Sequence, residues 1–212
     1  MKLVFIGQQG AGKGTIAALT KDKLNVPHIS TGDIFRSAIK QGTELGKTVQ
    51  DYLNKGKLVP DDVTAKIVKE RLQQSDCEKG FILDGFPRNL NQAKELDKLM
   101  QMDKVILLDI KDDLTVYRLS ARRVCKECAE TFNINPDGFP HPTDEGKCTK
   151  CGGEIYQRDD DKEGAIRERL RIYHTETEPI LDFYEEKAVL RKVDSSRDVK
   201  FIVEDTLEAI NS

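Results

Sequence analysis

The chain contains no tryptophan, only three histidines and no long hydrophobic run. A membrane-spanning helix needs about 20 consecutive apolar residues, and no stretch approaches that length. The first apolar run, Leu3–Ile6, follows a single lysine and is too short to form the core of a secretion signal. We therefore expect a cytoplasmic protein without a membrane segment.

An excess of positive charge is also missing. The 34 basic residues are balanced by 37 acidic ones, which gives a net charge of −3. Broad binding to nucleic acid or to a membrane surface usually needs a basic excess, so both are disfavoured. With 38% hydrophobic and 33% charged residues, the 212-residue chain has the composition of a globular protein with one core and room for a small appendage.

Cysteine is scarce, but four of the five cysteines form two C-x2-C pairs. Without a secretion signal such pairs predict a metal site, with disulfides as a weaker alternative. The complete spacing, C-x2-C-x19-C-x2-C, is typical of structural zinc, because four thiolates fill every tetrahedral position. The predicted ligands are Cys125, Cys128, Cys148 and Cys151. Cys77 is interpreted as an isolated thiol, and His141, which lies off the paired spacing, as a surface residue.

Apolar runs alternate with segments of helical periodicity along most of the chain. Strands are expected at residues 3–6, 81–83, 105–110 and 189–194. Helical patterns cover residues 13–24, 33–40, 44–55, 61–74, 89–100, 112–123, 164–187 and 198–210. Pro179 should end or kink the helix in which it lies. The alternation predicts an α/β fold with a parallel sheet flanked by helices.

Residues 124–158 interrupt this pattern, because they are polar, dotted with glycine and proline, and poor in aliphatic side chains. Too few apolar residues are present for this segment to fold alone, so a metal ion would have to supply the missing stability. The core candidates are Val124, Phe132, Ile134, Phe139, Ile155 and Tyr156.

The stretch GQQGAGKGT, residues 7–15, lies between the first predicted strand and the first predicted helix. Glycine lets several N–H groups converge on phosphate oxygens, and the helix N-terminus adds positive potential. Lys13 can then reach the outer phosphates, while Thr15 lies near the usual hydroxyl position on the metal side. A glycine-rich turn without a ligand is the plain alternative. The predicted phosphate ligands are Gly10, Ala11, Gly12, Lys13, Gly14 and Thr15.

Five motifs, in order along the chain, together resemble those of the adenylate kinase family: GKGT (12–15), STGDIFR (30–36), DGFPRN (84–89), ARR (121–123) and RDDD (158–161). Residues 124–158 resemble the long, zinc-bearing lid of the bacterial-type members. The chain departs from the family at Gln9, where proline is frequent. Because backbone amides bind the phosphate, we expect altered loop rigidity there rather than lost binding.

The resemblance implies a P-loop NTPase-like core (residues 1–29, 60–121 and 160–212), a small helical insert for the nucleoside monophosphate (30–59) and a zinc-bearing β lid (122–159). It also implies a monomer that uses ATP, AMP and ADP with Mg²⁺, in the reaction MgATP + AMP ⇌ 2 ADP. The attacking phosphate oxygen is already ionised, so catalysis needs positioning and charge neutralisation rather than a general base.

Two other functions stay open. The first is a UMP/CMP kinase, although Thr31 and Gln92 favour AMP. The second is a zinc-ribbon binding module coupled to a nucleotide switch, which the mixed charges of residues 124–158 disfavour.

For the ATP side, the resemblance places Arg118 against the adenine and Arg122 at the phosphates. The donor base is also expected near Thr131, Phe132 and Arg197. Arg118 and Arg122 are four residues apart, so on one helix they would share a face. A solvated cationic face is the alternative for any single arginine. The implied catalytic residues are Lys13, Arg88, Arg122, Arg158 and Arg169.

For the AMP side, the amide of Gln92 both donates and accepts, so it suits the edge of adenine, and Arg36 and Arg88 can grip the phosphate in bidentate fashion. Without the resemblance Gln92 would be an ordinary helix-surface residue. The implied AMP ligands are Thr31, Arg36, Lys57, Leu58, Val59, Gly85, Phe86, Pro87, Arg88, Gln92, Arg158 and Arg169.

Asp84 closes the apolar run FILD, where a carboxylate can hold magnesium through water, with Asp33 as a second contributor. A turn or helix cap is the alternative role for Asp84.

Overall fold

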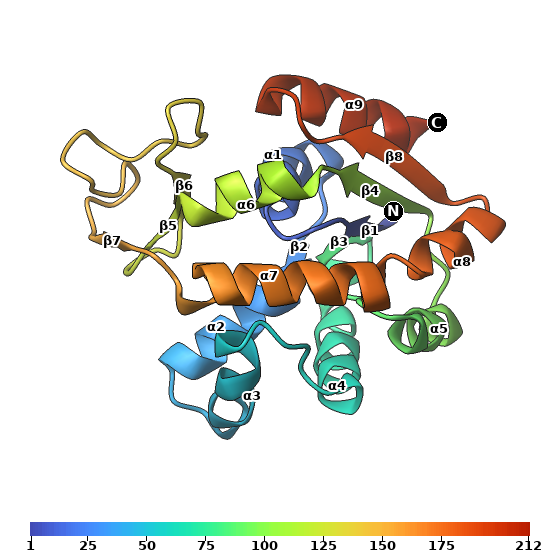
Figure 1. The fold of residues 1–212 in the computed structure, drawn as a ribbon. Coiled ribbons are helices and arrows are strands. Elements are labelled where there is room, and N and C mark those ends of the chain that lie inside the picture. Colours follow the sequence, from blue (N-terminus) through green and yellow to red (C-terminus); the bar gives the residue numbers. More distant parts are fainter.

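The computed structural model describes residues 1–212 and contains a five-stranded parallel sheet with helices on both faces (Figure 1). The strand order is β2-β3-β1-β4-β8. The strands are β1 (Lys2–Ile6), β2 (His28–Ser30), β3 (Phe81–Asp84), β4 (Lys104–Asp109) and β8 (Leu190–Asp194). The predicted α/β fold is therefore confirmed. Strand β2 was not expected, because its three residues include two that are only partly buried and give no apolar run.

Alternate side chains of the central strands enter two separate cores, one on each face of the sheet. Val4 and Ile6 pack toward α4 (Asp61–Leu72), α5 (Leu90–Leu99) and α8 (Ile180–Glu186). Leu3 and Phe5 pack on the other face, toward α1 (Lys13–Leu24) and α9 (Val199–Asn211). Burial on both faces explains why these strands are continuously apolar in the sequence.

The buried face of helix α1 differs from the face that the spacing of its apolar residues predicts. Ile16, Ala17 and Thr20 are buried, whereas Leu19 is 41% exposed. The Thr20 hydroxyl donates to the carbonyl of Ile16 at 2.7 Å, so the polar side chain is satisfied inside the core.

Two helices, α2 (Thr31–Lys40) and α3 (Glu44–Asn54), project from one end of the sheet and pack on each other (Figure 1). The side chains of Ser30 and Thr43 cap their N-termini by accepting from backbone N–H groups. Phe35, Val49 and Val59 form a small apolar core between these helices. Residues 30–59, for which the resemblance implies a monophosphate site and which are called the monophosphate insert below, thus have a core of their own.

A second, three-stranded antiparallel sheet lies in residues 122–159, called the lid segment below (Figure 1). Its strands are β5 (Arg122–Cys125), β6 (Thr131–Asn133) and β7 (Ile155–Tyr156). Helix α6 (Asp112–Ser120) ends before β5 begins. The expectation that Arg118 and Arg122 share one helical face is therefore wrong, because the chain changes from helix to strand between them.

The predicted helix 164–187 is divided into three parts. Helix α7 (Glu163–Ile172) continues into a π-helical turn (Tyr173–Thr177), and α8 starts directly after Pro179. Proline is tolerated at a helix start, because the N–H group that it lacks has no partner there. The chain also contains a 3₁₀ turn at Ser75–Cys77 and another at Asp159–Asp161. In no part of the structure is a helix both long and apolar enough to cross a bilayer.

Candidate active site

The candidate site lies at the carboxyl ends of β1 and β3, where the glycine loop and Asp84 follow their strands. β1 pairs with β3 on one side and with β4 on the other. Where the chain leaves two adjacent parallel strands in opposite directions, a crevice opens at the carboxyl ends of those strands. Sheets of this kind bind ligands in that crevice.

The glycine loop adopts the backbone that its composition predicts. Gly10 and Gly12 have φ values of 89° and 85°, in the left-handed region. A Cβ atom at Gly7 would lie 2.4 Å from the carbonyl oxygen of Leu108, so only glycine fits where the loop passes β4. Lys13 folds back over the loop, where its Nζ donates to the carbonyls of Gly7 and Gln8, both at 2.8 Å.

Lys13 is surrounded by more positive than negative charge. Burial lowers the pKa of Lys13 to about 8, and the nearby guanidinium groups of Arg88, Arg169 and Arg122 act in the same direction, while Asp84 opposes them. Burial also lowers the pKa of Arg169 to about 9. An anion such as a polyphosphate would relieve this repulsion.

Asp84 is a buried carboxylate that faces the glycine loop. Burial opposes its ionisation, but the neighbouring His28 and the charge of Lys13 lower the pKa of Asp84 below its usual range. Nε2 of His28 lies 3.5 Å from Oδ2 of Asp84 and has no hydrogen-bond partner. Asp33, by contrast, is exposed and forms an ion pair with Arg36.

A cavity of about 530 Å³, open to solvent, lies between the sheet and the monophosphate insert. Ten of the predicted AMP ligands line it: Thr31, Arg36, Lys57, Leu58, Val59, Gly85, Arg88, Gln92, Arg158 and Arg169. Of the other two, Phe86 is buried in the main core, and Pro87 lines a neighbouring cavity of about 320 Å³ together with Lys13.

Gln92 is buried rather than at the surface, and its amide is held in one orientation. Its Oε1 accepts from the backbone N–H of Arg88 at 2.8 Å, and its Nε2 donates to Oδ1 of Asp61 at 2.6 Å. Asp61 also accepts from Asn89 and Asn91. These bonds lower the pKa of Asp61 although burial opposes the shift. No local pattern singles out Asp61, which lies about 30 positions from Gln92 in the chain.

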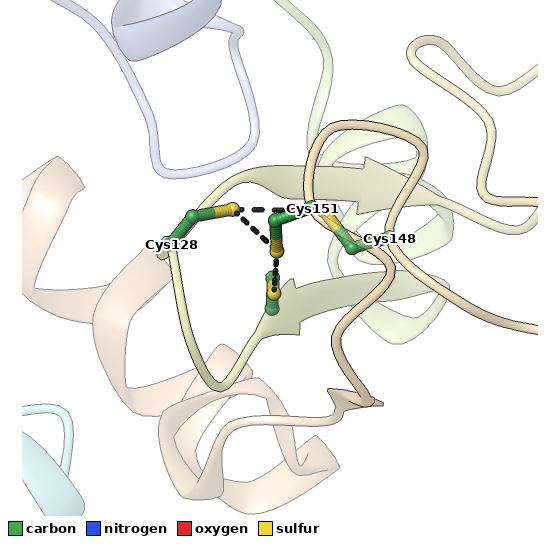
Figure 2. Close-up of side chains that lie close together, drawn as sticks. Cys128, Cys148 and Cys151 are labelled. Carbon is green, nitrogen blue, oxygen red and sulfur yellow. Dashed lines mark hydrogen bonds between the residues drawn. The ribbon is translucent and has the colours of Figure 1, made fainter.

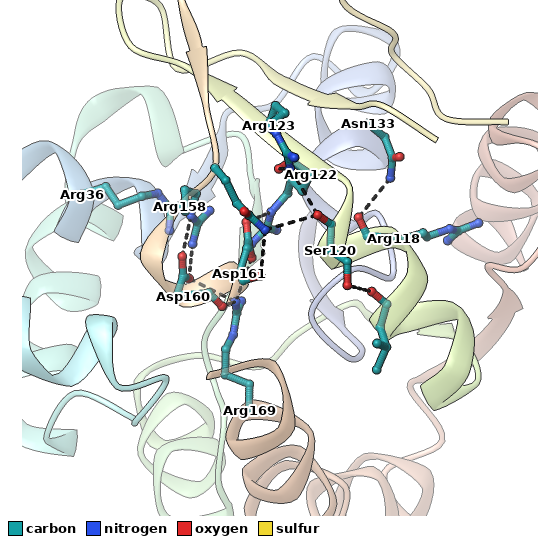
Figure 3. A network of polar contacts seen from close by, with 12 residues as sticks. Arg36, Arg118, Ser120, Arg122, Arg123, Asn133, Arg158, Asp160, Asp161 and Arg169 are labelled. Atoms are coloured by element: carbon teal, nitrogen blue, oxygen red, sulfur yellow. Dashed lines mark hydrogen bonds and ion pairs between the residues drawn. The ribbon is translucent and has the colours of Figure 1, made fainter. Parts of the chain in front are cut away.

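Arginines from three elements converge on two carboxylates beside this cavity (Figure 3). Arg122 holds Asp161 through two hydrogen bonds of 2.5 and 2.8 Å. Arg158 forms a bidentate pair with Asp160, and Nη1 of Arg169 lies 3.1 Å from Asp160. Neither acid was predicted as a site residue, although both lie in the RDDD motif.

The residues predicted for the donor base lie around α6, β6 and the turn after β8. Arg118 donates to the carbonyl of Ser195 at 2.8 Å. Phe132 is buried in the lid segment, where it packs with Cys125 and Cys148. Arg197 pairs with Asp205 and lies over the ring of Phe201.

The four paired cysteines converge in the lid segment (Figure 2). Their sulfur atoms all lie within 4.8 Å of one another, with neighbouring pairs at 3.4 to 3.5 Å. None of them is bonded to another as a disulfide. Four thiols at this spacing suit a tetrahedral ion with Zn–S bonds of about 2.3 Å. Cys77 lies elsewhere, buried beside Arg71.

Arg88 lines both the cavity that contains Gln92 and the cavity that contains Lys13 of the glycine loop. Such an arrangement suits the passage of a charged group between two phosphate-bearing substrates, and it places the protein among the P-loop phosphotransferases.

Comparison with known proteins identifies the family. The family model for adenylate kinase matches residues 5–189. An adenylate kinase of Archaeoglobus fulgidus is 48% identical over 220 residues, covering all of both chains. An adenylate kinase of Thermodesulfovibrio yellowstonii is 50% identical over 199 residues, or 91% of each chain, and one of Streptomyces coelicolor is 46% identical over 216 residues. The chain belongs to the adenylate kinase family, whose members transfer a phosphoryl group from ATP to AMP.

Proposed function

We propose that this chain carries out reversible phosphoryl transfer from MgATP to AMP by bringing the two sets of phosphates together at Arg88. The observation that supports this most directly is that Gly85 and Arg88 line both cavities, the one that contains Gln92 and the one that contains Lys13. A phosphate held in either cavity would therefore contact the same guanidinium group.

The residues predicted for the phosphates and for AMP have roles that their positions support. The amides of residues 10–15 and Lys13 hold the ATP phosphates, while Gln92 and Thr31 select the adenine of AMP and Arg36 holds its phosphate. Arg88, Arg122, Arg158 and Arg169 neutralise the charge of the migrating phosphoryl group. No side chain has to accept a proton from the nucleophile, because a phosphate oxygen of AMP is ionised at neutral pH.

The carboxylates of Asp160 and Asp161 pair with three of these arginines, Arg122, Arg158 and Arg169. Substrate phosphates would replace them as partners, so binding exchanges one set of ion pairs for another. This exchange would let the lid segment close over the site and exclude water, as lids do in phosphotransferases. Residues 1–29, 60–121 and 160–212 would form the unit against which both inserts move, and one chain supplies every group, which suits a monomer.

We propose that Cys125, Cys128, Cys148 and Cys151 hold a structural zinc ion. Four protein ligands leave no open position, so the ion would stabilise the lid segment and take no part in the reaction. Free thiols at this spacing need a reducing compartment, which fits the expected cytoplasmic location.

Magnesium bound with ATP would neutralise phosphate charge, and the buried carboxylate of Asp84 is suited to hold it through water. A Cβ at Gly14 would lie 3.8 Å from Oδ2 of Asp84, so this carboxylate reaches the end of the phosphate loop. Asp33 fits the role less well, because it would first have to release Arg36.

The test is a coupled assay of ADP formation from ATP with AMP, UMP or CMP, using the wild type and the Gln92→Leu variant. We expect AMP to be preferred by at least about 100-fold in kcat/KM, and the variant to lose most of that preference, because a buried amide rejects bases that cannot pair with it. Preference for UMP or CMP would support the pyrimidine kinase instead, and absence of ADP with every acceptor would support the binding module.

A further inference from the structure

The side chain of Gln8, next to the glycine loop, is buried and makes two hydrogen bonds to α6. Its Nε2 donates to Oδ1 of Asp112 at 2.7 Å, and its Oε1 accepts from the hydroxyl of Thr115 at 2.7 Å. A carboxylate can only accept and this hydroxyl donates, so the two partners together fix the orientation of the amide.

The backbone of Gln8 holds the loop from the other side. Its carbonyl accepts from the N–H of Ala11 at 3.2 Å and from Nζ of Lys13 at 2.8 Å. Gln8 thus accepts from Lys13 through its backbone carbonyl and is bonded to α6 through its side chain. The side-chain bonds to α6 therefore restrict the movement of the residue whose carbonyl accepts from Lys13.

Asp112 is in turn held by His174 of the π-helical turn. Nε2 of His174 lies 3.0 and 3.1 Å from the two carboxylate oxygens of Asp112, and its Nδ1 lies 2.8 Å from Oε2 of Glu178. Asp112 on α6 and Glu178 on the same turn are the carboxylates that face this ring, and Tyr173 lies edge-on to it.

The π-helical turn also contacts the AMP side of the site. The hydroxyl of Thr177 donates to the carbonyl of Arg88 at 2.7 Å, and both Tyr173 and Thr177 line the cavity that contains Lys13. A π-helical turn is rare and is frequent at functional sites. Here it is bonded to α6 through His174 and Asp112, and to the loop after β3 through Thr177 and Arg88.

We propose that Gln8, Asp112 and His174 are positioning residues, which hold the glycine loop and Lys13 in the conformation that binds the ATP phosphates. This inference rests on the proposed function, since it assigns the support of that same site. It also gives a reason why the chain tolerates Gln9, which cannot stiffen the loop as proline does. A hydrogen-bonded side chain at position 8 restricts the loop instead, so less conformational entropy is lost when phosphate binds.

The test compares Asp112→Ala with Asp113→Ala. Both changes remove an acidic residue from the first turn of α6, so they alter the helix dipole equally, but only Asp112 bonds to Gln8. We expect the Kd of a non-hydrolysable ATP analogue, measured by calorimetry, to rise about tenfold for Asp112→Ala and less than about twofold for Asp113→Ala. The KM for AMP should change little in either.

A second variant, Gln8→Met, keeps the side-chain length and removes both bonds, and it should show the same loss of ATP affinity. Equal ATP affinity in Asp112→Ala and Asp113→Ala, or a lower melting temperature in Gln8→Met with unchanged Kd, would overturn the inference. The binding measurement does not depend on turnover. Failure of the wild type to form ADP would therefore refute the proposed function and leave this test intact.

Discussion

The monophosphate insert and the lid segment are of similar length, but different physical interactions hold them together. The monophosphate insert has two amphipathic helices around Phe35, Val49 and Val59, with further apolar contacts from α4. In the lid segment the buried cluster consists of Phe132 and two cysteines, while Ile134, Phe139 and Tyr156 remain exposed. Apolar burial suffices for the first segment, whereas the proposed zinc ion would supply the stability that the second lacks.

The two segments also contribute different groups to the candidate site. The monophosphate insert supplies cavity walls through residues such as Lys57 and Val59, whereas the lid segment supplies Arg122 and Arg158, which are paired with acids at its end. Residues of both segments line this cavity, but of the two segments only the lid segment has arginines that are paired with Asp160 and Asp161.

The largest effect expected from this difference concerns Arg158. Replacing it with methionine removes a charge that is required mainly in the transition state, so we expect kcat to fall about 1,000-fold while the KM for AMP changes much less. Steady-state kinetics checks this result, and Arg167→Met, on the exposed face of α7 with Glu163 as its partner, is the matched control. An equal loss in both variants would contradict a special role for the lid arginine.

The next largest effect is metal removal. A zinc chelator, or the Cys148→Ala change, should lower the opening free energy of amides in residues 124–158 by about 3 kcal/mol or more, because metal binding supplies most of the folding energy of such a segment. Hydrogen exchange measures this for each segment. Amides of residues 30–59 in the same sample are the control, and equal loss of protection there would remove the contrast between the two segments.

A smaller effect is expected for Val49→Ala. Val49 is completely buried in the core of the monophosphate insert, and its truncation should lower the free energy of unfolding by about 2 kcal/mol. Urea denaturation with and without chelator checks that the loss is the same in both conditions. The adjacent and exposed Gln50→Ala should change stability by no more than about 0.5 kcal/mol. A loss for Val49→Ala that appears only without metal would show that the two segments are coupled.

The smallest effect concerns His174, which lies outside both segments. The hydrogen bond to Glu178 and the contact with Asp112 raise the pKa of His174 above its usual value, although partial burial opposes the shift. Because the pKa of His174 is higher in the folded than in the unfolded protein, protonation of His174 stabilises the fold. This stabilisation is complete below the pKa of the unfolded state and is lost as the pH rises through the pKa of the folded state. His174→Gln should therefore be less stable than the wild type at pH 6, by less than about 1 kcal/mol because the pair is exposed, and equally stable at pH 9.

Thermal melts at both pH values measure this difference. His141→Gln in the lid segment is the control, because that ring contacts only the carbonyl of Pro142. A stability difference for His174→Gln that is the same at pH 6 and pH 9 would contradict the assignment of charge to His174.

Local sequence patterns predicted the features whose geometry depends only on residues that are close together in the chain. The glycine spacing around Lys13, the two C-x2-C pairs and the apolar runs of four strands were all visible in the sequence. Strand β2 was missed because it is short, and the shared helical face of Arg118 and Arg122 was wrong because periodicity does not mark where α6 ends.

The sequence by itself determined the phosphate-binding loop, the cysteine set and the alternation of strands and helices, because each depends on backbone preferences and spacings within one short stretch. Only the tertiary structure decided that Asp61 orients Gln92, that Asp160 and Asp161 hold the arginines, and that Gln8 reaches His174 through Asp112. Most of these partners lie tens of residues apart in the chain. Their pairing depends on how the helices pack on the sheet, and no local pattern encodes that packing.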